Sequence, residues 1–81
     1  MSFQHATSTA PADADFIAYK DTGVWVVVQR RSDGVFSTIA NTDDTGFDLI
    51  AAGISASRKS LWNAETGQFI CGTVGQLSPI A

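Results

Sequence analysis

The chain has 81 residues, with eight acidic and five basic side chains, a net charge of −3 and an isoelectric point near 4.6. This length predicts one small domain. No apolar run is long enough to span a membrane, and the N-terminus has neither the basic start nor the apolar stretch of a secretory signal. The acidic balance argues against non-specific nucleic-acid binding as the main activity. The single cysteine excludes an internal disulfide framework and a multi-cysteine zinc site, and it fits a reducing compartment, most simply the cytoplasm.

The first 15 residues are rich in Ser, Thr, Ala, Pro and Asp and carry one isolated aromatic, Phe3. They show no hydrophobic period, so we expect a disordered N-terminal arm over residues 1–15. The composition changes sharply at Phe16, which predicts a single folded domain over residues 16–74. The last residues, 75–81, are expected to form a loosely ordered C-terminal tail.

Three β-strands are predicted in the first half of the domain, at Phe16–Lys20, Val24–Arg31 and Val35–Ala40. The apolar run Val24–Val28 is rich in β-branched residues and indicates a central strand that is covered on both faces. Phe16–Lys20 is expected at an edge of the sheet, where it would be free to pair with a partner strand or with a second copy of the chain.

Three turns share one chemistry, in which two polar residues precede a glycine: Asp21–Gly23, Ser32–Gly34 and Glu65–Gly67. Glycine adopts the positive φ that tight hairpin loops require, and the polar side chains hydrogen-bond the turn backbone. We therefore expect three β-hairpins.

One helix is predicted over Gly46–Ser57, because Phe47, Ile50, Ala51 and Ile54 repeat at helical spacing. Thr45 and Asp48 loosely match the capping-box pattern at its start. The helix either ends near Ser57 or continues past Leu61. We favour the first reading, since the segment 60–72 then closes as a hairpin.

The predicted element order is β-β-β-α-β-β, which indicates an α+β domain with an antiparallel β-sheet and one helix packed on one face. The helix would supply Phe47, Ile50 and Ile54 to the core. The sheet would supply one face of the 24–28 strand together with Ile17, Ile39 and Ile70.

No catalytic, cofactor or metal residues are predicted. The one histidine, His5, lies in the N-terminal arm, and Cys71 is expected to be a small buried apolar residue. Two Asp-Thr-Gly triplets, at 21–23 and 44–46, match the aspartic-protease signature weakly and are explained by a turn and a helix cap. The aspartates near residue 45 are explained by capping rather than by cation binding.

Protein binding is the function that these observations favour: a non-enzymatic domain whose acidic surface suits a partner protein with a basic surface. Tryptophan and tyrosine are frequent interface anchors. The residues predicted to contact the partner are Asp43, Asp44, Asp48, Tyr19, Trp25 and Trp62. In size and charge the chain resembles the small acidic inhibitors, including anti-CRISPR proteins, that phages and mobile elements encode against host nucleases. This resemblance implies that it blocks a nucleic-acid-binding surface.

Two alternatives remain open. A small RNA- or single-strand-binding module would use four of the five basic residues, with aromatic side chains as stacking platforms; these are Arg30, Arg31, Arg58 and Lys59. A structural subunit would instead assemble as a homodimer through an edge strand.

Overall fold

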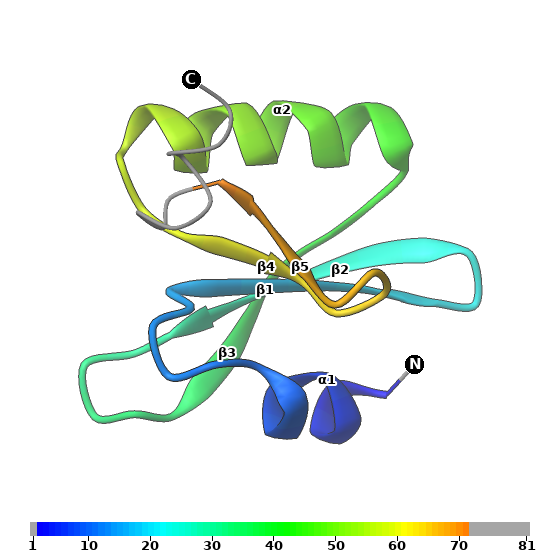
Figure 1. The fold of residues 1–81 in the computed structure, drawn as a ribbon. Coiled ribbons are helices and arrows are strands. Elements are labelled where there is room, and N and C mark those ends of the chain that lie inside the picture. The colour runs from blue at the N-terminus through cyan, green and yellow to red at the C-terminus, as the bar shows by residue number, and fades with distance from the viewer. Residues whose placement is uncertain (1, 72–81) are drawn as a thin grey trace.

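The computed structural model describes residues 2–71, which form an α+β domain with a five-stranded sheet of order β3-β2-β1-β4-β5 (Figure 1). The α+β class and one main helix are therefore confirmed. The elements in chain order are α1 (Phe3–Thr9), β1 (Phe16–Asp21), β2 (Val24–Arg30), β3 (Phe36–Thr42), α2 (Asp44–Ala56), β4 (Leu61–Asn63) and β5 (Gln68–Cys71). The observed order differs from the predicted one because α1 precedes the first strand.

The sheet is mixed, which corrects the prediction of a purely antiparallel sheet. β1 pairs antiparallel with β2 and parallel with β4. Residues 16–20 therefore lie in the middle of the sheet, and the edges within residues 2–71 are β3 and β5. The cause is the return connection through α2, which brings β4 to the side of β1 that the first hairpin leaves open. Turn chemistry predicts antiparallel neighbours only, and it carries no information about such a crossover.

All three predicted hairpins are confirmed. β1 pairs with β2, β2 with β3 and β4 with β5, each antiparallel. Asp21 faces Val24 in the first hairpin, and the two loop residues between them, Thr22 and Gly23, have φ of 51° and 82°. Two consecutive positive φ values are typical of a type I′ turn, the loop that matches the twist of a hairpin.

Helix α2 begins two residues earlier than predicted. Its N-cap is Asp43, whose carboxylate accepts a hydrogen bond from the backbone N–H of Gly46 at 2.9 Å, so the predicted capping by Thr45 and Asp48 is wrong. Gly46 is required by close packing, because a Cβ there would collide with the side chain of Thr42. The C-cap is Ser57, which confirms that the helix ends near this residue.

Both faces of the sheet are covered, as Figure 1 shows with α2 above the sheet and α1 below it. The α2 face contains Phe16, Ala18, Val27, Phe47, Ile54, Leu61 and Cys71. The α1 face contains Ala6, Ala14, Ile17, Tyr19, Val26 and Val28. Ile17 was expected to pack under the predicted helix; it lies instead on the opposite face. Strand β1 is buried on both faces because it is central.

Ile39 and Ile70 do not belong to the core, which corrects two predicted core positions; they are 47% and 37% exposed. Each is the extra residue of a β-bulge. Val27 and Val28 pair with Ala40 and Thr38, which leaves Ile39 without a partner across the ladder. Leu61 and Trp62 pair with Cys71 and Phe69, which likewise leaves Ile70 without a partner across the ladder. A bulge re-aims the extra side chain, and alternation in the sequence does not reveal where it occurs.

The structure also differs from the expected disordered arm over residues 1–15. Phe3–Thr9 forms α1, with Ser2 as N-cap, and both Ala6 and Ala14 are fully buried. Alanines have no long apolar side chain to produce a hydrophobic pattern, so the packing of this segment is not visible in the sequence. The predicted tail over 75–81, and the end of the predicted domain at 74, lie outside the described residues.

The segment 11–15 is fixed to the sheet by two side chains. The guanidinium of Arg30 donates to the carbonyls of Pro11 (3.1 Å) and Ala14 (3.0 Å). The buried hydroxyl of Ser60 donates to the carbonyl of Asp13 (2.6 Å) and accepts from the backbone N–H of Asp15 (2.8 Å). These bonds place the start of β1 between β2 and β4.

Substituting Ser60→Ala is expected to lower the free energy of unfolding by about 1–3 kcal/mol, since it leaves the part-buried backbone N–H of Asp15 and carbonyl of Asp13 without this partner. Chemical denaturation measures the change. Ser32→Ala, at an exposed turn position, is the control and should change stability by less than about 0.5 kcal/mol. Equal effects of the two substitutions would contradict the assigned role of Ser60.

Candidate protein-binding surface

The acidic start of α2 forms one end of the molecule. Asp43, Asp44 and Asp48 are all exposed there. Asp44 also contacts the sheet: its Oδ1 accepts a hydrogen bond from the indole Nε1 of Trp25 at 2.7 Å and lies 3.3 Å from the ammonium nitrogen of Lys20. The structure thus brings four of the predicted partner-binding residues, the three aspartates and Trp25, to the same region.

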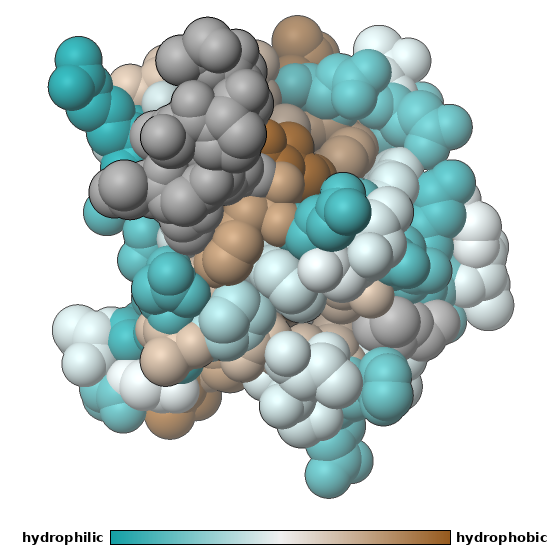
Figure 2. All heavy atoms as spheres, in the orientation of Figure 1, coloured by the Kyte–Doolittle hydropathy of each residue, from teal (hydrophilic) through white to brown (hydrophobic). Residues whose placement is uncertain are grey.

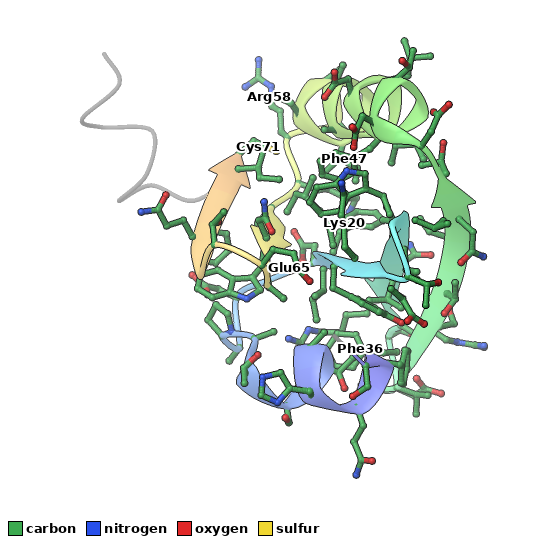
Figure 3. All side chains as sticks on the ribbon, turned by 90° about the vertical axis from the view of Figure 1, so that its right-hand side faces the viewer. Lys20, Phe36, Phe47, Arg58, Glu65 and Cys71 are labelled. Atoms are coloured by element: carbon green, nitrogen blue, oxygen red, sulfur yellow. The ribbon has the colours of Figure 1, made fainter. Side chains whose placement is uncertain are left out.

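Trp25 is half-buried and holds α2 against the sheet. Its ring stacks on Phe47, with the ring centroids 4.2 Å apart and the planes 11° from parallel. The ammonium of Lys20 lies 5.2 Å from the Trp25 ring centroid, and Figure 3 shows Lys20 close to Phe47 below the helix. Trp25 therefore joins strand β2 to α2, and only part of its ring is exposed.

These contacts lower the pKa of the Asp44 carboxyl below its ordinary value. The hydrogen bond from the Trp25 indole is the largest cause, followed by the hydrogen bond and the positive charge of Lys20. Asp44 is therefore ionised throughout the neutral range, and its charge is partly balanced by Lys20. Asp43 is used as the helix cap.

Asp48 and Leu49 on the outer side of α2 have no such structural role. The Asp48 side chain is exposed and makes no hydrogen bond or ion pair within residues 2–71. Leu49 is 72% exposed and is the most exposed large apolar side chain in the described part of the chain. The exposed residues Ala52 and Ala56 continue the same outer face. Figure 2 shows apolar atoms standing among hydrophilic ones at the top of the molecule, where Figure 1 places α2.

Sequence reasoning missed Leu49. Its place in the helical period could have revealed it. Phe47, Ile50 and Ile54 form the apolar face of the helix, and a leucine at position 49 lies outside this face and cannot point into the same core. Such a residue is either an isolated surface apolar group or a contact residue.

The other two predicted partner-binding residues lie on the opposite face of the sheet. Tyr19 is buried on the α1 side, and burial, with a smaller contribution from Asp21, raises the pKa of its hydroxyl. Trp62 is half-buried on the same side and meets Phe69 edge to face, with the ring centroids 5.0 Å apart. The structure therefore does not bring Tyr19 and Trp62 together with the aspartates.

The four basic residues of the nucleic-acid alternative are split between the two sides of the sheet. The Arg30 guanidinium lies on the α1 side, 4.5 Å from the ring centroid of Phe36. Arg58 follows α2 and has a positive φ of 60°, and Figure 3 shows Arg58 and Phe36 at opposite ends of the view. Arg31 and Lys59 are exposed. Because Arg30 is engaged with residues 11–14 on the α1 side, the structure does not bring it together with Arg58, which follows α2.

The groups considered for catalysis are also separated. His5 lies exposed on α1, whereas Cys71 is buried in the core on the α2 side, as expected for a small apolar residue. Burial is the main reason that the pKa of the Cys71 thiol is raised, although hydrogen bonds lower it in part. Within residues 2–71, no group of three or more His, Cys, Asp or Glu side chains could hold a metal ion. No helix in this range is long and apolar enough to cross a membrane.

Comparison with known proteins identifies no relative of this chain. No protein-family model matches the chain, and searches of curated proteins and of solved structures find no significant similarity. Function is therefore inferred from the surface of the molecule itself.

Protonation of Asp44 is expected to remove its contacts with Trp25 and Lys20. Because its pKa is lowered in the folded state, this stabilisation is present above the pKa of an unfolded aspartate and is lost as the pH falls through the folded value. Asp44→Asn should therefore lower the melting temperature near neutral pH and have little effect in strong acid.

A carboxyl-detected NMR titration checks the cause of the shift. Lys20→Met should move the Asp44 midpoint to higher pH and leave the Trp25 hydrogen bond in place. A midpoint that does not change would show that Lys20 contributes nothing to the electrostatics of this site.

Proposed function

We propose that this chain is a non-enzymatic protein-binding domain that docks the outer face of α2 onto a basic surface of a partner protein. The observation that carries the proposal is Leu49, which is 72% exposed on a helix whose first turns carry acidic side chains. A helix that presents an apolar anchor beside charges is a common recognition element for a groove on another protein.

The two kinds of side chain would contribute differently. Burial of a leucine side chain at an interface is worth about 1.5–3 kcal/mol. Exposed carboxylates add less affinity, but they speed association with a positively charged partner and fix its orientation. Asp48 suits this role because no contact within the described chain competes for it.

A partner with a basic surface is often a nucleic-acid-binding protein, and the proposed function is therefore inhibition by occupying such a surface. The net charge of −3 over 81 residues supports this assignment, because an acidic chain would compete with a phosphate backbone for the same basic side chains of the partner. Two observations favour it over direct nucleic-acid binding: the acidic balance, and the engagement of Arg30 with the backbone of residues 11–14.

Leu49→Ser and Asp48→Lys are each expected to weaken partner binding by tenfold or more while changing the melting temperature by no more than a few degrees, since both side chains are exposed. Quantitative capture from the native host, followed by titration of the captured protein, measures the loss. Val35→Ser makes a similar apolar-to-polar change and Asp13→Lys the same charge reversal, both at exposed positions elsewhere, and both variants should bind as the wild type does.

Equal binding by all four variants would contradict the proposed surface. A titration with mixed single-stranded oligonucleotides at low salt tests the alternative function. Affinity that falls steeply with added salt would favour a nucleic-acid-binding module instead.

A further inference from the structure

The α1 face of the sheet is rich in large apolar and aromatic side chains, but its cover is made of small ones. Strands β1 and β2 contribute Ile17, Tyr19, Val26 and Val28, and the rim contains Phe36, Trp62 and Phe69. The residues that pack on them from α1 and the following segment are alanines: Ala6, Ala10 and Ala14. The one large apolar side chain of α1, Phe3, is 40% exposed. Methyl groups thus make the contacts of this cover with the sheet.

This face also contains an unused hydrogen-bond donor. The indole Nε1 of Trp62 is buried and has no partner in the described structure. A buried N–H without an acceptor costs about 1–3 kcal/mol. The present cover therefore leaves a donor unsatisfied that a different occupant could satisfy.

Helix α1 is attached to the domain by packing alone, while the segment that follows it is firmly fixed. The described side-chain hydrogen bonds of α1, from Thr7, Ser8 and Thr9, all close on carbonyls of the helix itself. The bonds to the body of the domain begin at Pro11, which accepts from Arg30. The chain is thus fixed to the sheet from Pro11 onward, and a displacement of α1 about the Ala10–Pro11 junction would break none of the described hydrogen bonds of the sheet.

We propose that α1 is a displaceable cover, and that the face beneath it binds an amphipathic helix from another protein. The incoming helix would carry a large apolar residue where Ala6 now packs and a carboxylate or carboxamide that accepts from Trp62 Nε1. This site is separate from the proposed contact surface on α2, because the sheet lies between them (Figure 1).

The present occupant indicates the shape of the new one. α1 is a helix lying on this face of the sheet, so the face accommodates a helix. A second copy of α1, exchanged between two molecules, would bring the same alanines and would leave Trp62 without an acceptor. The unsatisfied donor therefore favours a helix of different sequence over an exchanged α1.

Hydrogen exchange on the full wild-type chain tests whether α1 is released from the sheet while the sheet stays folded. Amides of residues 6–10 are expected to exchange at least 100-fold faster than those of β1, because they are released without unfolding the sheet. Equal protection of α1 and β1 would overturn the proposal, since it would show that α1 opens only when the whole domain unfolds.

Binding is tested with a displayed library of 15-residue amphipathic helices, selected against the full chain carrying Ala6→Glu. A buried carboxylate at residue 6 disfavours the closed state, and Gln4→Glu makes the same charge change at an exposed position of α1. Selected peptides should bind Ala6→Glu at least tenfold more tightly than the wild type or Gln4→Glu. Trp62→Phe should weaken that binding about tenfold, and acidic or amide side chains should be enriched.

Leu49→Ser separates this site from the one on α2, because it should bind the selected peptides as tightly as its parent. If Ala6→Glu does not fold, the same library is selected against the wild type. Bound peptide must then increase hydrogen exchange in α1. No selected peptide, or binding that is indifferent to Trp62→Phe and to α1, would overturn the proposal.

Discussion

The paired hydrogen bonds between Asp15 and Ser60 hold together the starts of the two parallel strands at the centre of the sheet. The backbone N–H of Asp15 donates to the Ser60 hydroxyl at 2.8 Å, and the backbone N–H of Ser60 donates to the Asp15 carboxylate at 3.0 Å. They join segments 45 positions apart and place the start of β4 beside the start of β1. With β2 on its other side, β1 becomes the centre of the sheet. A central strand buried on both faces requires two covering layers, and the chain provides α2 for one and α1 for the other.

The two covers differ in how they are built. α2 contributes Phe47 and Ile54 to the core, stacks on Trp25 and has a well-formed cap at each end, so it is an integral part of the domain. The one buried residue of α1 is Ala6. Large apolar side chains hold a helix in place far more strongly than alanines do. This asymmetry is the basis of the two proposals, a fixed contact surface on α2 and a displaceable cover in α1.

Local features were predictable from the sequence. The glycine turns, the β-branched strand and the end of α2 at Ser57 all follow from short-range chemistry, and the structure confirms them. The parallel pairing of β1 with β4 was not predictable, because it depends on contacts between distant segments. Neither were the bulges that expose Ile39 and Ile70.

The candidate sites also divide into local features that the sequence predicts and long-range features that it does not. The clustering of the aspartates on one helix end was readable from their spacing, whereas the placement of Tyr19 and Trp62 depends on which face of the sheet each strand residue meets. Trp25 and Trp62 consequently report on different halves of the molecule, one packed under α2 and the other on the α1 side. The intrinsic fluorescence of single-tryptophan forms would follow the two layers independently, without any added label.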